Sequence, residues 1–234
     1  MVTAQYKLGL AHALGRGATH NASAAMVWFH RAAEQGHVAA QHNLGVMFYE
    51  GYGVDRDPGE ALRWFRAAGE RGDVDAQNKV GVMYANADGA PKDAAEAVKW
   101  FLLAAEQGSS QAQYNLGLMY YRGQGVAQDD VQAVRWFIKA AEQGHGFAQF
   151  NLAAMYSKGR GLPQNYIEAY SWALLALERG VATAIHACHR LETLMPAEDV
   201  AEAKRRKSAF RTYRAAKKTD DDKAASHSPR RPVS

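Results

Sequence analysis

Residues 112–125 read AQYNLGLMYYRGQG, and this stretch decides the fold. Related stretches start with the same Ala-Gln pair at positions 4, 40, 76 and 148, and read AQYKLGL, AQHNLGV, AQNKVGV and AQFNLAA. The spacing is 36 residues in every case. Self-similarity at a period of roughly 20 to 50 residues indicates stacked structural repeats rather than a domain with one closed core.

The tryptophans and most of the glycines follow the same period. A residue type that recurs so regularly serves the backbone or the core of each unit, so most of the unusual composition is structural. The five tryptophans are Trp28, Trp64, Trp100, Trp136 and Trp172.

The second half of each unit has the signals of a helix. Its N-cap is Asn or Asp, whose side chain accepts a hydrogen bond from a free amide of the first turn. A Glu or Gln three residues later predicts a capping box in four of the five units. A glycine at the end of the helix predicts a left-handed C-terminal cap. The predicted N-caps are Asn21, Asp57, Asp93, Asp129 and Asn165.

The first half of each unit is also predicted to be a helix. At 100° per residue, Ala112, Leu116 and Met119 share one apolar face, and Gly117 lies beside it. A helical glycine costs about 1 kcal/mol relative to alanine, so we expect a neighbouring helix to approach closely there. The Gly-x-Gly that follows is a turn. The pattern argues against a phosphate loop, because no strand precedes it and no Gly-Lys-Ser/Thr follows.

These residues resemble a known family. The pattern A-x-x-x-L-G-x-x-Y-x-x-G-x-G, followed by A-x-x-W-F-x-x-A-A-E-Q-G, is similar to the Sel-one-like repeat, a relative of the tetratricopeptide repeat. The match is closest over residues 112–144. The resemblance implies an all-α, right-handed α-solenoid of antiparallel helix pairs, a bacterial source and a role in protein binding. Ala87, Ala153 and Ala173 depart from the pattern, where a loop glycine, the helix glycine and a phenylalanine are expected.

Three segments are predicted. Residues 1–182 hold five repeats, residues 183–218 form a C-terminal capping helix pair with a basic last helix, and residues 219–234 form a disordered tail. Residues 198–218 hold eight Lys or Arg against three acidic residues, whereas the rest of the chain is close to neutral. The basic pI of about 9.1 therefore belongs to one segment, which argues against the whole body binding nucleic acid.

The sequence predicts a chain without a membrane span or a signal peptide, and a cytoplasmic location as written. The chain begins inside the first helix of its first unit, and terminal repeats normally need a cap. A fragment of a longer periplasmic or secreted protein is therefore an alternative. The single cysteine, Cys188, allows no internal disulfide.

Catalytic and metal chemistry have weak support. An enzyme needs a nucleophile, a base and an acid that converge in one pocket, and no such set recurs in the sequence. His186 and His189 share a helix face near Cys188, but a metal site would need further ligands. We therefore predict no catalytic residue, no metal site and no cofactor. A hydrolase of the same repeat family and a self-associating structural solenoid remain the alternatives.

A binding surface is better supported. The resemblance implies that the first helices line the concave side of the solenoid, where the side chains vary from unit to unit. Aromatic residues beside arginine are typical of interaction hot spots. Some of these side chains could instead pack only against the next repeat. We predict a protein partner whose peptide or helix lies in the concave groove, with a homodimer through the uncapped first helix as an alternative. The predicted contacts are Tyr6, His42, Tyr49, Asn78, Tyr114, Tyr121, Arg122 and Phe150.

Overall fold

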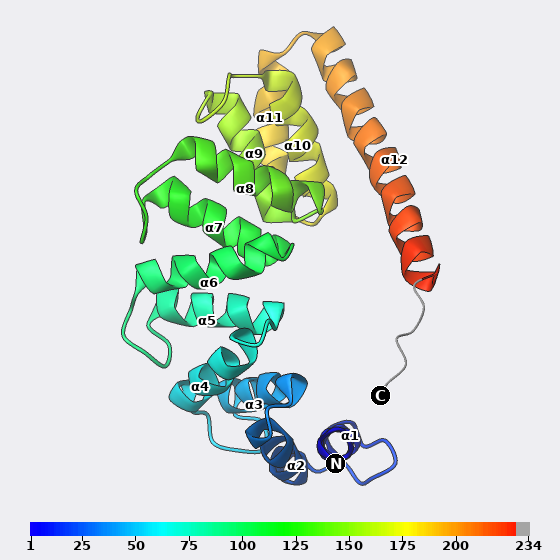
Figure 1. Cartoon of the computed structure of the whole chain (residues 1–234). Helices are drawn as coiled ribbons and strands as arrows, with labels where there is room; N and C mark the ends of the chain where they lie inside the picture. The colour runs from blue at the N-terminus through cyan, green and yellow to red at the C-terminus, as the bar shows by residue number, and fades with distance from the viewer. Residues whose placement is uncertain (228–234) are drawn as a thin grey trace. The chain divides into compact units, whose positions relative to one another are not determined.

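The computed structural model describes residues 1–227, and side chains as far as residue 212. Within this range the chain is entirely helical and has no strand. Figure 1 shows the helices following one another along the chain. They are α1 (Val2–Leu14), α2 (Ala22–Glu34), α3 (Val38–Glu50), α4 (Pro58–Gly69), α5 (Val74–Asn86), α6 (Ala94–Glu106), α7 (Ser110–Arg122), α8 (Asp130–Glu142), α9 (Gly146–Lys158), α10 (Tyr166–Glu178), α11 (Ala184–Leu194) and α12 (Ala197–His227).

The chain divides into two compact units, and the division falls between the two helices of the fourth repeat. The first unit, Met1–Asp129, contains α1 to α7, and each odd-numbered helix from α1 to α5 packs on the helix that follows it. The second unit starts at Asp130 and contains α8 to α12. In this unit α9 packs on α10, which also contacts α11 and α12.

The helix starts confirm the N-cap half of the capping boxes predicted at Asp57, Asp93 and Asn165. Asp57 Oδ1 accepts a hydrogen bond from the Glu60 amide at 3.0 Å, and Asn21, Asp93 and Asn165 make the same bond. The reciprocal half is wrong for Glu60. The Asp57 amide donates instead to the Phe48 carbonyl at 2.9 Å, and the Glu60 carboxylate binds Arg63. The amide is thus already used to join the two helices of the repeat.

In the first three helix pairs, a glycine of the first helix faces a phenylalanine ring of the second. A Cβ on Gly45 of α3 would lie 2.6 Å from the Phe65 ring of α4, and Gly9 and Gly81 face Phe29 and Phe101 in the same way. The predicted close approach is confirmed. In the fifth repeat Ala153 replaces the glycine and Ala173 replaces the phenylalanine, and both are buried. The two departures therefore compensate each other.

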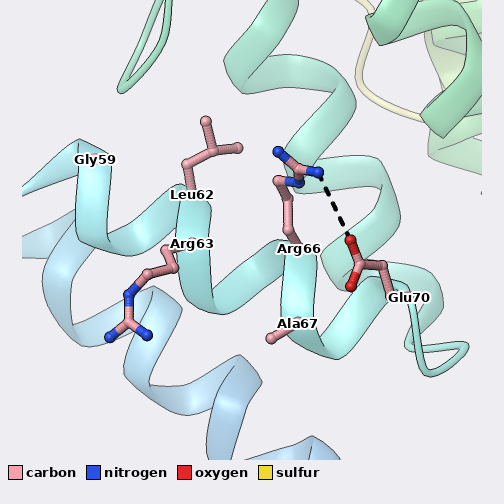
Figure 2. Close-up of a pocket in the computed structure, with 6 residues that line it drawn as sticks. All are labelled: Gly59, Leu62, Arg63, Arg66, Ala67 and Glu70. Carbon is pink, nitrogen blue, oxygen red and sulfur yellow. Dashed lines mark ion pairs between the residues drawn. The ribbon is translucent and has the colours of Figure 1, made fainter.

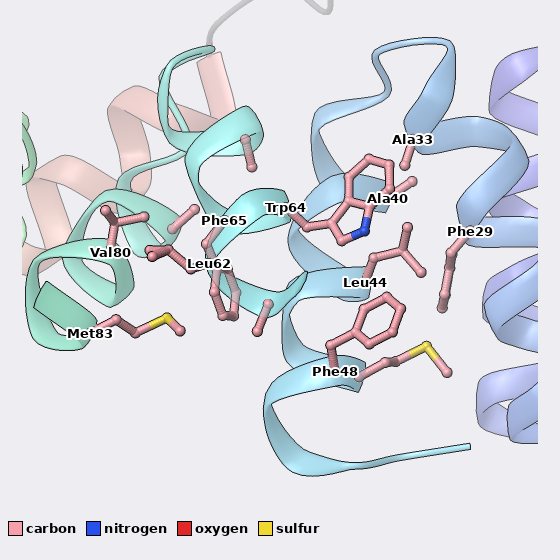
Figure 3. Packing of buried hydrophobic residues seen from close by; sticks show 14 of the residues in the cluster. Phe29, Ala33, Ala40, Leu44, Phe48, Leu62, Trp64, Phe65, Val80 and Met83 are labelled. Atoms are coloured by element: carbon pink, nitrogen blue, oxygen red, sulfur yellow. The ribbon is translucent and has the colours of Figure 1, made fainter. Parts of the chain in front are cut away.

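In the first unit, the buried apolar residues around these contacts form a continuous core. Figure 3 shows Leu44 lying among Trp64, Phe48 and Phe29 in this buried cluster. Trp64 and Trp100 are buried, as the repeat pattern predicts. Trp28, Trp136 and Trp172 are only half-buried, so the tryptophans do not contribute equally to the core.

The Gly-x-Gly turn connects the two helices of one repeat and packs on the preceding repeat. Its first glycine is a left-handed cap, with φ of 71° at Gly51. Its second glycine, Gly89, has a φ of 83°, and a Cβ there would lie 2.2 Å from the carbonyl oxygen of Pro58, the first residue of α4. Gly125 lies in the same way against Ala94 at the start of α6. Side chains are excluded at the second position because the loop rests on the preceding repeat.

Buried glutamines form a second joint between repeats. Each donates its side-chain amide to a backbone carbonyl at the end of the preceding second helix: Gln41 to Ala33, Gln77 to Gly69, Gln113 to Ala105 and Gln149 to Ala141. The Gln of a Glu-Gln-Gly helix end completes this joint in the third repeat, where Gln107 Nε2 donates to Gln77 Oε1 at 2.7 Å.

Arginine replaces that Gln at positions 71 and 179. In these two repeats Gln41 Oε1 and Gln149 Oε1 have no hydrogen-bond partner among the described residues.

The basic helix α12 packs against the acidic side chains of α10. Lys207 Nζ binds Glu178 Oε1 at 2.8 Å, and Arg206 binds Glu168. Exposed ion pairs contribute little to stability. The contact between the rings of Phe210 and Trp172, whose centroids lie 5.1 Å apart, therefore orients the helix. The helix continues past the predicted boundary at residue 218 to His227, since neither glycine nor proline interrupts this segment. The rest of the predicted tail, residues 228–234, lies outside the described residues.

The glycine–phenylalanine contact is tested by a double-mutant cycle. We expect Gly45→Ala to destabilise the intact protein by about 1 kcal/mol, because overpacking outweighs the gain in helix propensity. In a Phe65→Ala background the same change should be stabilising by up to about 1 kcal/mol. Urea unfolding followed by circular dichroism measures both values. Stabilisation in both backgrounds would show that the ring does not impose the glycine.

A second prediction concerns Ala87, which caps α5 with a φ of 61°. This conformation costs a residue with a Cβ about 1 kcal/mol. We therefore expect Ala87→Gly to raise the thermal midpoint, with a gain of about 0.5 to 1 kcal/mol. The matched control is Ala95→Gly on the exposed side of α6, which should lower the midpoint. A fall in both variants would contradict the assignment.

Candidate partner-binding site

Three of the predicted contacts occupy one register on successive first helices and touch the next repeat. The Tyr6 ring stacks on His37 with a centroid distance of 4.4 Å. His42 Nδ1 lies 3.0 Å from Asp73 Oδ1, and Asn78 Oδ1 accepts a hydrogen bond from Asn115 Nδ2 at 3.0 Å. His37 and Asp73 are the N-caps of α3 and α5. These half-buried side chains therefore connect repeats and also present polar edges on the same side of the first unit.

Tyr49 lies in a cluster with charged side chains. The Arg56 guanidinium and the Lys79 ammonium each lie 5.5 Å from the ring centroid, and the ring meets Phe65 edge-on. Burial raises the pKa of the Tyr49 hydroxyl above its ordinary value, and a hydrogen bond to Asp88 raises it further. Tyr49 therefore stays neutral at physiological pH, and both cations lie close to its ring.

The remaining predicted contacts differ in exposure and in position. Tyr114 and Tyr121 on α7 are half-buried, and Arg122 at the end of that helix is exposed. Phe150 belongs to the second unit, where it packs against Ala176 and Val181. The structure thus brings Tyr49 together with Lys79 and places Phe150 in a separate unit.

Two neighbours of the predicted contacts were not singled out from the sequence. Lys79 approaches Tyr49, and Asn115 joins Asn78 to Gln111 through side-chain hydrogen bonds. A signal was available for the asparagine, because this poor helix former recurs in mid-helix at residues 43, 115 and 151.

Two of the second helices, α2 and α4, carry open hollows. Figure 2 shows the one on α4, of about 380 Å³, with Gly59 and Leu62 beside Arg63 and Arg66. Arg66 pairs with Glu70 at 3.7 Å, and Arg63 pairs with Glu60 at 2.7 Å. A hollow of about 230 Å³ on α2 uses the positions 36 residues earlier. The hollows are therefore features of the repeat, and their charged side chains already have partners.

The histidine and cysteine group of α11 is not assembled into a metal site. Cys188 is buried, whereas His186 and His189 are exposed. Among the described residues, no group of three His, Cys, Asp or Glu side chains could hold a metal ion. In the same part of the chain, no helix is long and apolar enough to cross a membrane.

Cys188 gives a direct test of this packing because it is the only cysteine in the chain. Burial raises the pKa of its thiol to about 11, and the Glu192 carboxylate adds to the rise. Since the thiolate is the reactive form, we expect slow modification by a disulfide reagent at pH 8 that accelerates in urea with the loss of helicity. Modification in the native state as fast as that of a free cysteine would place the thiol at the surface.

A chain of helix pairs that recur every 36 residues, with each connecting loop packed on the preceding pair, is a helical-repeat protein, or α-solenoid. The Sel1 repeat model matches residues 2–37, 38–73, 74–109, 110–145 and 146–181, so the chain belongs to the Sel1 repeat family. Proteins of this family are generally protein-interaction scaffolds, and their all-helical solenoids are typically non-enzymatic. A search of curated proteins found no match.

Two solved structures are similar over most of this chain. One is a protective antigen of uropathogenic Escherichia coli strains with an SLR fold. It is 36% identical, with a TM-score of 0.81, over 90% of this chain and 46% of its own. The other is a Sel1 repeat protein from Oxalobacter formigenes, 36% identical with a TM-score of 0.76, over 80% of this chain and 76% of its own. The present chain thus spans about half the length of the antigen.

Proposed function

We propose that this protein is an adaptor that holds a peptide or a helix of a partner protein against the side chains of its first helices. The observation that carries the proposal is the Tyr49 cluster, in which the cationic groups of Arg56 and Lys79 each lie 5.5 Å from the centroid of an aromatic ring, at a position where the residue differs from repeat to repeat. Tyrosine and arginine are the residues most often found at interaction hot spots. The recurring residues, in contrast, form the core and the joints.

A non-catalytic role is supported by two groups with shifted pKa values, His145 and Tyr170. Burial lowers the pKa of His145, but its Nδ1 accepts a hydrogen bond from the Ala148 amide and caps α9. Burial raises the pKa of Tyr170, and its hydroxyl donates to Glu192. Both groups are engaged in structural contacts, so their shifts do not indicate an acid or a base.

A protein fits the site better than nucleic acid does. Much of the formal positive charge lies on α12, where Arg206 and Lys207 already pair with Glu168 and Glu178 of α10. A second candidate is a homodimer through α1, which exposes Leu8 and Leu14 by 42% and 57%. Light scattering over a range of concentrations separates a dimer from an adaptor that remains a monomer.

The adaptor proposal is tested with Tyr114→Ala combined with Tyr121→Ala. We expect this variant to lose partners that the intact chain captures from a lysate of the source organism, because aromatic anchors dominate such interfaces. The matched control is Val27→Ala with Leu103→Ala, which removes exposed apolar side chains from α2 and α6. Capture is read by mass spectrometry and folding by circular dichroism.

The control should keep every partner. Equal capture by all three proteins would contradict the proposal, and a large loss of helicity in the tyrosine variant would assign these residues to packing between repeats.

A further inference from the structure

The second unit has an exposed face on α9 and α11 that no joint between repeats uses. We call it the α9–α11 face and define it by Phe147, Lys158, Arg190 and Leu194. Phe147 and Lys158 lie on one side of α9, 11 residues apart. Leu194 of α11 stands 36 positions after Lys158, and Arg190 lies one turn before Leu194 on the same side of α11. The 36-residue register extends to α11, because its buried residues stand 36 positions after buried residues of α9. Both helices pack on α10, and all three contribute to one buried cluster.

The face exposes large apolar side chains. Phe147 is 57% exposed and Leu194 is 55% exposed. Among the described residues of the second unit, only Val131 is a further large hydrophobic side chain with such exposure. Phe147 is also specific to its repeat, since Thr3, Ala39, Asp75 and Gln111 occupy the equivalent positions. The core therefore does not require an aromatic residue there.

The charges on this face have one sign. Lys158 and Arg190 are exposed, and neither forms an ion pair with a described residue. α9 contains no acidic residue. The one acid of α11, Glu192, is turned toward α10 and α12, where it accepts a hydrogen bond from Tyr170 and lies 3.8 Å from Lys204. The face is therefore complementary to carboxylates.

We propose that the α9–α11 face binds an extended acidic segment of a partner protein, with apolar side chains on Phe147 and Leu194 and carboxylates on Lys158 and Arg190. Eleven helical residues span about 16 Å. That is the separation of Phe147 from Lys158, and an extended chain covers it in about five residues. Because Leu194 occupies the position on α11 equivalent to Lys158, the two apolar side chains of the ligand should also be about five residues apart. The inference rests on the proposed function for the premise that the partner is a protein, and it adds the chemistry of that partner.

Single-stranded nucleic acid is the competing ligand, because it also combines negative charge with stacking. It is less favoured here. Such sites use aromatic rings on which successive bases stack, together with a basic groove along the backbone. The α9–α11 face has one exposed ring, and its second apolar contact, Leu194, is aliphatic.

The probe is a fluorescein-labelled peptide, GFEDEELG, whose Phe and Leu are five residues apart. We expect saturable binding to the full chain with a Kd below about 1 mM, measured by fluorescence anisotropy at low salt. Two control peptides, GFKRKKLG and GSEDEESG, reverse the charge and remove the apolar side chains. Both should bind at least about tenfold more weakly.

Two double variants test the face itself. Lys158→Glu with Arg190→Glu, and Phe147→Ala with Leu194→Ala, should each weaken binding of GFEDEELG by about tenfold or more. The matched control is Arg16→Glu with Lys92→Glu, which makes the same change in net charge on exposed loops of the first unit. It should change the Kd by less than about twofold, since distant exposed charges are screened. Thermal unfolding verifies that every variant is folded.

Three results would overturn the inference. They are no binding of GFEDEELG up to about 1 mM, equal weakening of binding by the control charge reversal, and tight binding of a short oligothymidylate in place of the peptide. Peptide binding that survives on the face variants but is lost with Tyr114→Ala and Tyr121→Ala would move the site to the first unit, overturning the inference while supporting the proposed function. Peptide binding lost only with the face variants, with unchanged lysate capture by the tyrosine variant, would uphold the inference and contradict the proposed function.

Discussion

The contact between a helical glycine and a phenylalanine ring is the constraint on which the first three helix pairs depend. In the second repeat, Gly45 allows the ring of Phe65 to approach to a distance that no Cβ would permit. Such an approach brings the backbones of α3 and α4 close enough for Leu44 and Trp64 to share one buried cluster. The loss in helix propensity at the glycine is thus offset by packing across the pair.

Two further contacts extend this arrangement from pair to pair. The second glycine of each turn lies against the start of the preceding second helix, and a buried glutamine binds the end of that same helix. Both ends of α2, α4, α6 and α8 are therefore held by the repeat that follows. The residues in these contacts recur at the repeat period, so the side chains that vary from repeat to repeat lie at the positions that such contacts leave exposed.

Much of the fold could be predicted from the sequence, because each decisive residue recurs at the repeat period. Asp57 as an N-cap, Gly45 as a close contact and Gly36, with a φ of 81°, as the left-handed residue at the end of α2 follow from local rules that hold without tertiary information. The reciprocal half of the capping box failed because the Asp57 amide binds Phe48, a partner in the other helix of the pair. A local rule does not account for such competition.

The candidate site was less predictable for the same reason. The pairing of His42 with Asp73 and the approach of Lys79 to Tyr49 each join residues about 30 positions apart. Their geometry depends on how two repeats stack, which periodicity alone does not give. The basic character of α12 was visible in the sequence, whereas its pairing with Glu178 depends on where the helix packs. Exposure of Phe147 and Leu194 was likewise decided by packing rather than by residue type.

The contacts within a repeat and those between repeats differ in what they demand of the sequence. Within a pair, glycine must be matched to phenylalanine or alanine to alanine, as Ala153 and Ala173 illustrate. Between pairs, the glutamine joint and the second glycine both meet backbone atoms, such as the Ala33 carbonyl and the Pro58 carbonyl. A backbone carbonyl is available for these contacts whatever the side chain of its residue. The glutamine joint and the second-glycine contact would therefore survive if whole repeats were duplicated, deleted or reordered in evolution, whereas side-chain pairs between repeats, such as His42 with Asp73, would have to be matched again.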